Sequence, residues 1–215
     1  MLEGKFAVLY SKNKIKYLNL KIPKLKKGQV LVKIMYSGVC RSQIMEFKGQ
    51  RGKDKYLPHL FGHEAAGKVE FVGAGVSKVK KNDEVILSWI KSSGLEASNP
   101  IFKHNGKLIN AGNVTTFSEY TIVSENKVIK KPKNISWKFA SIFGCAFLTG
   151  AGLVLNRLDK IKRDKIISVY GLGGIGMSML SMLISMGFKN VISIDKNRKK
   201  LHIAKKIGAK FCIDS

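Results

Sequence analysis

The chain has 215 residues, of which 45% are hydrophobic, so it can bury the core of one large or two small globular domains. Its formal net charge of +25 comes mostly from lysines scattered over every segment. A nucleic-acid-binding surface instead gathers arginine and aromatic residues on one face, so the composition argues against a nucleic-acid partner. A basic nucleic-acid-binding protein is kept only as a third alternative.

The N-terminal residues and the cysteines bear on the cellular compartment. The stretch "KFAVLY" at 5–10 alternates and lacks the uninterrupted apolar region of a secretory signal peptide. Cys40, Cys145 and Cys212 are too few and too far apart for a disulfide framework, so we expect reduced thiols or metal ligands. Both features predict a cytoplasmic protein.

Short strands dominate the sequence from Lys5 to about Lys131. Alternating polar and apolar residues with many β-branched side chains predict strands within 5–10, 14–20, 29–38, 65–73, 83–89 and 118–125. Asn82 is expected to adopt a left-handed conformation in the connection before the strand at 83–89. One short helix is expected over Ser42–Lys48, with Ser42 capping its first turn. This part of the chain is predicted to be mostly β and barrel-like.

After Pro132 the pattern changes to strands that alternate with helices. Strands are predicted at 166–170, within "NVISID" at 190–195 and within "AKFCID" at 209–214, with helices between them and Gly208 ending the second helix. The uncharged run 166–188 is long enough to cross a bilayer at ~20 residues. Its clustered glycines suit a strand–turn–helix better, so no membrane contact is expected. The pattern predicts an α/β unit with a parallel sheet.

A glycine-rich motif, "GLGGIG", lies between the first strand and the first helix of this α/β unit. Asp195 ends the next strand, at about the ~20-residue spacing of the dinucleotide-binding fingerprint. The helix N-terminus then binds a pyrophosphate, and Asp195 binds the adenosine ribose and disfavours the 2′-phosphate of NADP. The sequence therefore predicts an NAD site made by Gly171, Leu172, Gly173, Gly174, Ile175, Gly176 and Asp195. Glycines that serve strand–helix packing alone are the alternative.

Cys40, His63 and Cys145 form a Cys₂His set, the pattern of a catalytic zinc with water as the fourth ligand. No local spacing joins the three residues, and each has another explanation. Both cysteines can be small buried residues, and His63 can be an ordinary core histidine. From the residues alone, the zinc site and these explanations both stay open.

Four motifs resemble those of zinc-dependent alcohol dehydrogenases of the medium-chain dehydrogenase/reductase family. They are "GVCRS", "GHEAAG", "GCAFLTG" and "GLGGIG", in this order and at these separations. The resemblance implies that Cys40, His63 and Cys145 bind the catalytic zinc, with the Glu64 carboxylate behind it. It also implies hydride transfer between NAD and a small alcohol, or the corresponding aldehyde or ketone. Zinc-free relatives that reduce quinones are a further alternative, against which the retained ligands argue.

The resemblance also implies roles for single residues. Ser42 matches the hydroxyl residue that contacts the substrate alcohol and begins its proton relay. Arg41 matches a residue at the cofactor pyrophosphate, Thr149 one beside the nicotinamide, and Lys200 one near the adenosine ribose. Trp89 falls where relatives place an aromatic wall of the substrate pocket, which favours small alcohols.

Three positions depart from the family pattern. Gln43 replaces the aspartate that orients the zinc histidine, a loss that typically costs about 10- to 100-fold in metal affinity or activity. Met45 replaces a relay histidine. The segment 90–110 lacks the cysteines of a structural zinc, so one zinc is expected.

The chain stops after the third strand of the α/β unit. We therefore expect a barrel-like zinc-binding catalytic domain over 1–150, followed by the first half of a dinucleotide-binding (Rossmann) domain over 151–215. This incomplete sheet predicts a fragment or truncated product of an enzyme that is homo-oligomeric at full length. A catalytically inactive remnant that still binds zinc or nucleotide is the second functional alternative.

Overall fold

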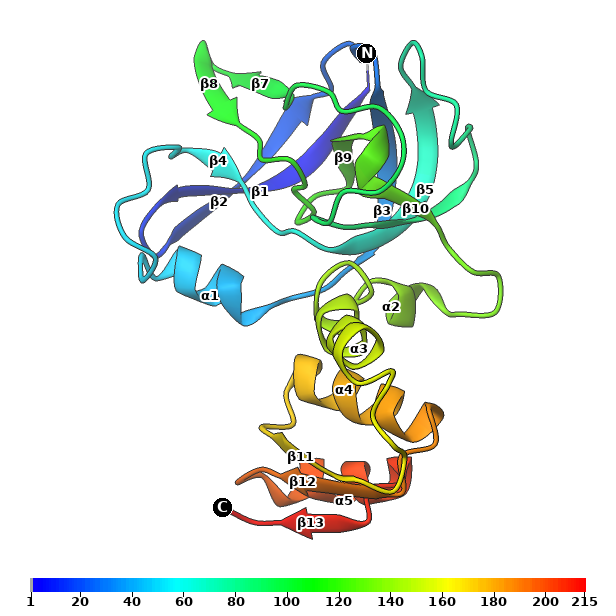
Figure 1. The fold of residues 1–215 in the computed structure, drawn as a ribbon. Coiled ribbons are helices and arrows are strands. Elements are labelled where there is room, and N and C mark those ends of the chain that lie inside the picture. The colour runs from blue at the N-terminus through cyan, green and yellow to red at the C-terminus, as the bar shows by residue number, and fades with distance from the viewer. Residues whose placement is uncertain (1) are drawn as a thin grey trace. The chain divides into compact units, whose positions relative to one another are not determined.

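The computed structural model describes residues 2–215 (Figure 1). The chain divides into two compact units, Met1–Cys145 and Ala146–Ser215. The boundary expected after residue 150 lies inside helix α3 (Ala146–Arg157), which opens the second unit. Within residues 2–215, no helix combines the length and apolar character that crossing a membrane requires.

Two curled sheets build the first unit, so the mostly-β, barrel-like prediction is confirmed (Figure 1). One sheet has the order β2 (Lys14–Lys21), β1 (Glu3–Ser11), β4 (His59–Leu60), β8 (Lys107–Asn110) and β7 (Ile101–His104). The other has the order β10 (Val128–Lys130), β6 (Glu84–Leu87), β5 (Ala65–Val72), β3 (Gln29–Ser37) and β9 (Tyr120–Ser124). The sequence did not predict β4, β7, β8 and β10, because runs of two to four residues are too short to show alternation.

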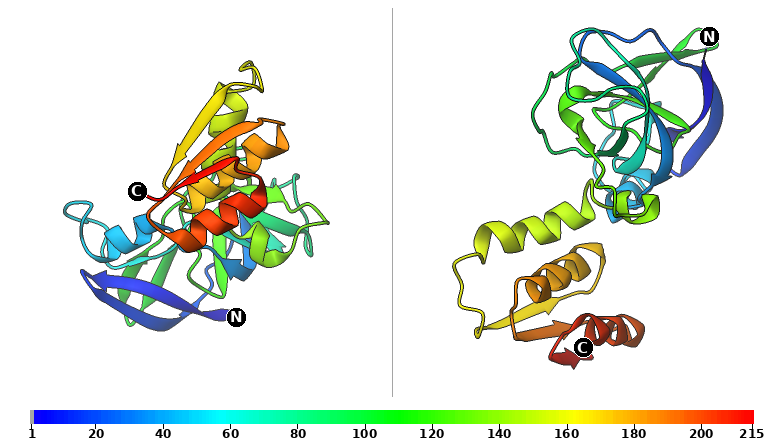
Figure 2. Two further views of the ribbon diagram at one scale, coloured as in Figure 1. Left: turned by 90° about the horizontal axis from the view of Figure 1, so that it is seen from below. Right: turned by 90° about the vertical axis from the view of Figure 1, so that its right-hand side faces the viewer.

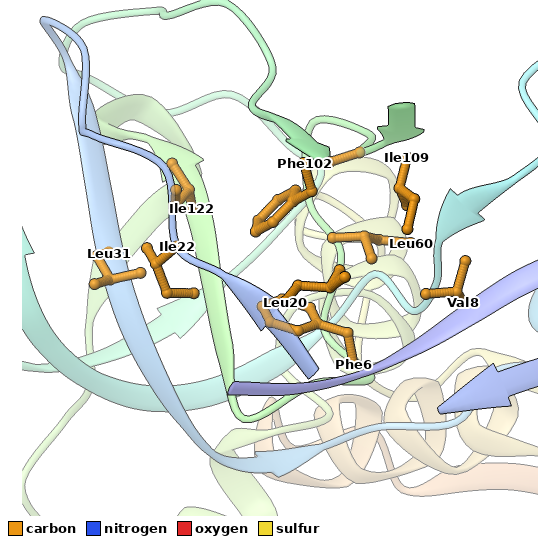
Figure 3. Packing of buried hydrophobic residues seen from close by; sticks show 10 residues of the cluster. Phe6, Val8, Leu20, Ile22, Leu31, Leu60, Phe102, Ile109 and Ile122 are labelled. Atoms are coloured by element: carbon orange, nitrogen blue, oxygen red, sulfur yellow. The ribbon is translucent and has the colours of Figure 1, made fainter. Parts of the chain in front are cut away.

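The first half of strand β3, Gln29–Val32, is buried on both faces and separates two clusters of the core. Its Leu31 packs with Phe6 and Phe102 between the two sheets, where side chains from several strands converge (Figure 3). Its Val30 and Val32 point the other way, into a valine-rich cluster. Each fully buried side chain of this kind contributes about 1.5–3 kcal/mol through the hydrophobic effect. These two clusters anchor the first half of β3, the strand that precedes the first candidate ligand.

Short helices follow the strands of the first unit. They are α1 (Arg41–Phe47), the 3₁₀ turn η1 (Glu125–Lys127) and α2 (Trp137–Ala140). The prediction that Ser42 caps α1 is wrong, because the helix begins earlier and Cys40 is its N-cap, with φ −104° and ψ 155°. Asn82 has φ 74°, as predicted for the tight connection before β6.

Parallel strands and helices alternate in the second unit, which confirms the predicted α/β pattern (Figure 2). The order along the chain is α3, β11 (Ile166–Tyr170), α4 (Gly174–Ser185), β12 (Asn190–Ile194), α5 (Arg198–Ile207) and β13 (Phe211–Ile213). Strand β12 lies between β11 and β13. Gly208 ends α5 with φ 123°, as predicted. Helix α3 was not predicted, since Gly150 and Gly152 both disfavour a helix interior.

Candidate metal centre and cofactor loop

Three segments far apart in the sequence bring Cys40, His63 and Cys145 together. Cys40 is the N-cap of α1, His63 lies between β4 and β5, and Cys145 ends the first unit. One ligand atom from each residue, a sulfur or a ring nitrogen, lies within 4.8 Å of the other two. All three side chains are half-buried. The arrangement that local spacing could not establish is therefore present in the fold.

The His63 ring has the chemical state that a metal ligand needs. Burial, and after it the positive charge of Arg51, lowers the pKa of His63, so the imidazole is neutral at pH 7. Its Nε2 atom is buried and has no hydrogen-bond partner among residues 2–215. A buried nitrogen without a partner is costly unless something else satisfies it. Two cysteine sulfurs beside such a nitrogen are a donor set that suits Zn²⁺.

Glu64 joins the three segments that carry these residues. The residue is 1% exposed, and its main-chain carbonyl accepts hydrogen bonds from the Gly38 N–H at 3.1 Å and the Thr116 hydroxyl at 3.2 Å. A Cβ atom added to Gly38 would lie 2.6 Å from a Glu64 carboxylate oxygen, and one added to Gly144 would lie 2.9 Å from the Glu64 Cβ. The glycines before Cys40 and Cys145 thus let both segments approach the residue after His63.

Ser42 and Arg41 occupy the first turn of α1. The Ser42 hydroxyl is buried, and within the described chain it has no hydrogen-bond partner, although it was expected to cap this helix. Arg41 is exposed at the first helical residue. A buried hydroxyl without a partner can donate a hydrogen bond to a molecule that enters the site, or accept one from it.

Trp89 follows β6, and 47% of its surface is exposed. Its main-chain carbonyl accepts a hydrogen bond from the buried Lys127 amine at 2.6 Å. A Cβ atom added to Gly112 would lie 3.9 Å from the indole ring. The chain therefore holds the Trp89 backbone, while the residue stays partly exposed.

The segment after Trp89, where a structural zinc was not expected, is held by Glu125. One carboxylate oxygen accepts the N–H groups of Ser77 at 2.6 Å and Lys78 at 2.7 Å, and the other accepts the Leu95 N–H at 2.7 Å. Burial opposes ionisation, but these hydrogen bonds and the nearby Lys78 together lower the pKa of Glu125. Sequence analysis missed this role, because nothing local to Glu125 marks its three distant partners.

A second group of potential ligands, Glu46, Asp54 and His59, was also missed. His59 Nε2 lies 2.9 Å from an Asp54 oxygen and 3.7 Å from a Glu46 oxygen, and His59 Nδ1 lies 2.7 Å from the Leu60 carbonyl oxygen. Burial raises the pKa of Glu46 despite the opposing charges of His59 and Arg51. The three side chains form a cluster on the first unit, in which His59 and Asp54 are joined by a hydrogen bond.

The glycine motif of the second unit forms the turn between β11 and α4. Gly171 has φ 80°, and Gly173 is the N-cap of α4. A Cβ atom added to Gly173 would meet no described atom within 4 Å, so a ligand can approach the backbone there. A Cβ atom on Gly176 would instead collide with the Gly171 carbonyl oxygen. The turn thus exposes the first N–H groups of α4, which favour an anion.

Asp195 follows β12, and its side chain accepts hydrogen bonds from the backbone of the second unit. Its carboxylate accepts the N–H groups of Leu172 at 2.6 Å and Asn197 at 2.8 Å, and Lys200 Nζ lies 3.7 Å away. These two backbone hydrogen bonds lower the pKa of Asp195. The residue is only 9% exposed, so this carboxylate is largely enclosed by its own chain.

Thr149 lies on α3 close to the start of α4. A Cβ atom added to Gly174 would lie 3.2 Å from the Ala146 Cβ, and one added to Gly150 would lie 2.8 Å from the Ser178 Cβ. Close packing of α3 on α4 therefore depends on these glycines. Thr149, between Ala146 and Gly150, is exposed next to the glycine turn.

Comparison with known proteins identifies the family. Residues 26–133 match the family model of the alcohol dehydrogenase GroES-like domain. The chain is 32% identical over 210 residues to alcohol dehydrogenase 6 of Peromyscus maniculatus, an alignment that covers 86% of this chain and 56% of that protein.

Solved structures share the fold along the whole chain. Benzyl alcohol dehydrogenase from Acinetobacter calcoaceticus superposes with a TM-score of 0.85 at 24% identity, covering 100% of this chain and 64% of the other. An Escherichia coli alcohol dehydrogenase in complex with NADH has a TM-score of 0.79 at 24% identity, covering 99% and 63%. The chain thus spans less than two thirds of the length of these proteins. The match to the family model shows that the chain belongs to the zinc-type medium-chain alcohol dehydrogenases.

Proposed function

We propose that the chain carries the zinc-binding catalytic unit and the first part of the cofactor unit of an NAD-dependent alcohol dehydrogenase. The proposed reaction transfers hydride between NAD and a small alcohol, or the corresponding aldehyde or ketone. The observation that carries this proposal is the convergence of Cys40, His63 and Cys145, whose ligand atoms lie within 4.8 Å of one another. A single zinc and a cytoplasmic, homo-oligomeric full-length protein stay predictions from the sequence.

The first unit is proposed to hold the metal and the substrate. Cys40, His63 and Cys145 would hold zinc, which supplies a Lewis acid at an open fourth position. The buried Ser42 hydroxyl, which has no partner within residues 2–215, receives the proton that the substrate hydroxyl releases. Met45 has no group that could pass that proton on, so the proton would have to leave Ser42 through water or a hydroxyl of the cofactor. Trp89 limits the size of the substrate.

The second unit is proposed to hold NAD. The N–H groups at the start of α4, exposed by Gly171 and Gly173, bind the pyrophosphate. Asp195 binds the adenosine ribose with Lys200 beside it, and its negative charge disfavours the 2′-phosphate of NADP. Thr149 would contact the nicotinamide. The role of Arg41 at the cofactor pyrophosphate stays a prediction from the family resemblance.

Nicotinamide reduction by the native protein, purified from its own source, tests the proposal. Small primary alcohols are supplied with NAD or NADP, and the absorbance of the reduced cofactor is followed. We expect turnover that prefers NAD, stops after dialysis against a chelator and returns with Zn²⁺. Binding of zinc and NADH without any turnover on an alcohol or aldehyde panel would instead support a non-catalytic binding protein.

A further inference from the structure

Gln43 lies between the backbone of one candidate ligand and the ring of another. Its side chain is buried, with the residue only 4% exposed, on the first turn of α1. Its amide oxygen accepts the Cys40 N–H at 3.1 Å, and its amide nitrogen contacts His63 Nδ1. The two contacts use opposite branches of the planar amide, so one oxygen at this placement cannot serve both partners.

The Gln43 amide cannot satisfy both neighbouring N–H donors when His63 binds a metal. A His63 ring that binds a metal through Nε2 carries its proton on Nδ1, which then needs an acceptor. The Cys40 N–H at the helix N-terminus needs an acceptor as well. An amide offers an oxygen on one branch and an N–H donor on the other. The His63 Nδ1–H and the Cys40 N–H therefore compete for the single Gln43 amide oxygen. The donor that does not obtain the oxygen is left facing the N–H group of the amide.

The contacts of Gln43 in the structure favour the helix cap. The Gln43 oxygen accepts the Cys40 N–H, so the glutamine at the third helical position bonds back to the N-cap residue. Its NH₂ group then faces His63 Nδ1, which must be the acceptor, so the ring proton lies on Nε2. That nitrogen is the buried atom for which residues 2–215 provide no partner.

We propose that Gln43 is a positioning residue that holds His63 in the Nε2–H tautomer and thereby weakens metal binding. For a divalent ion to bind, the ring loses the Nε2 proton to solvent and gains a proton on Nδ1. The Gln43 amide then rotates so that its oxygen accepts the Nδ1–H, and the Cys40 N–H loses its acceptor. A carboxylate at position 43 removes this conflict, because both of its branches are acceptors. The inference rests on the proposed metal site.

The isosteric variant Gln43→Glu tests the inference through metal affinity. Affinity for Co²⁺ and Zn²⁺ is measured by competition with a chromophoric chelator, using the full chain. We expect Gln43→Glu to bind about 10- to 100-fold more tightly than the wild type, the range typical of partners that orient a ligand. Ile44→Glu adds the same charge on the next, exposed residue of α1, and its affinity should stay within about fivefold of the wild type.

The ¹⁵N chemical shifts of His63 in the metal-free protein report the tautomer directly. We expect the Nε2–H form in the wild type and the Nδ1–H form in Gln43→Glu. Three results would each overturn the role of Gln43. They are equal metal affinities for the wild type and Gln43→Glu, an equal gain in metal affinity for Ile44→Glu, and the Nδ1–H form in the wild type. Failure of every variant to bind Co²⁺ or Zn²⁺ overturns the proposed metal site and this inference with it.

Discussion

The carboxylate of Asp195 accepts the backbone N–H of Leu172 at 2.6 Å. The acidic residue at the end of β12 thus fixes the second residue of the glycine turn that follows β11. In the proposed function, the same carboxylate also binds the adenosine ribose. One side chain would therefore both shape the turn proposed to receive the pyrophosphate and contact the sugar next to it.

Replacing Asp195 with Asn tests this double role. The amide keeps the shape but loses the charge and one acceptor branch, and hydrogen bonds to charged groups are stronger than those to neutral groups. We expect NADH affinity, measured by fluorescence titration, to fall roughly 10- to 100-fold. Asp214→Asn removes a carboxylate that lies 2.7 Å from Arg198, and serves as the control with unchanged affinity. Equal affinities for the two variants would remove Asp195 from the cofactor site.

Glu125→Gln is expected to destabilise the first unit. Glutamine cannot accept on both branches, so one of the buried N–H groups that Glu125 now binds loses its partner, at a cost of about 1–3 kcal/mol. Chemical denaturation at pH 7 measures the change in the free energy of unfolding. Glu96→Gln, at an exposed residue that pairs with Lys91, should leave the free energy of unfolding nearly unchanged.

The pH dependence of this difference follows from the lowered pKa of Glu125. A carboxylate whose folded pKa lies below its unfolded value stabilises the protein above the unfolded pKa, about 4.3 for Glu. This contribution is lost as the pH falls through the folded value. The stability gap between wild type and Glu125→Gln should therefore be constant from pH 8 to about pH 5 and shrink below about pH 4. A gap that grew on acidification would contradict the assignment.

Gly144→Ala is expected to damage both stability and metal binding. The added methyl group would collide with the Leu87 carbonyl oxygen and crowd the Glu64 Cβ. Such overpacking costs about 1–3 kcal/mol, and it displaces the neighbouring Cys145. Thermal unfolding and Co²⁺ affinity should both decline. Gly152→Ala, in α3, meets only the Asn156 side chain at 3.8 Å and should be neutral or stabilising by up to about 1 kcal/mol.

Ser42→Ala separates proton transfer from metal binding. If Ser42 receives the substrate proton, kcat of the native enzyme should fall by about 10²- to 10⁴-fold while zinc content stays unchanged. Ser42→Thr keeps a hydroxyl and should recover part of the lost rate. A Ser42→Ala enzyme with wild-type kcat would show that the buried hydroxyl has no part in the reaction.

The sequence predicted the architecture where local periodicity and tertiary structure agree. Alternation identified β1, β3 and β5, and the glycine turn with its following helix identified the β11–α4 unit. Helix α3 was missed, because Gly150 is a poor helix former whose place is decided by close packing on α4. Ser42 was misassigned as a cap, since the helix begins at Arg41 and Cys40 is its N-cap.

The candidate site was less accessible to sequence reasoning than the fold. Cys40, His63 and Cys145 have no fixed spacing, so only the resemblance to a family joined them before the structure did. The orientation of Gln43 and the three backbone partners of Glu125 depend on segments that meet only in the folded chain. Neither contact leaves a periodic or compositional signal.

Metal analysis of cysteine and histidine variants tests the central claim most directly. Zinc content per chain is measured for the wild type, Cys40→Ser, His63→Ala and Cys145→Ser, with Cys212→Ser, the remaining cysteine of the chain, as the control. We predict one zinc in the wild type and in Cys212→Ser, and its loss from each of the other three variants. Zinc retained in those three, or lost equally from Cys212→Ser, would contradict the metal centre on which the proposed function depends.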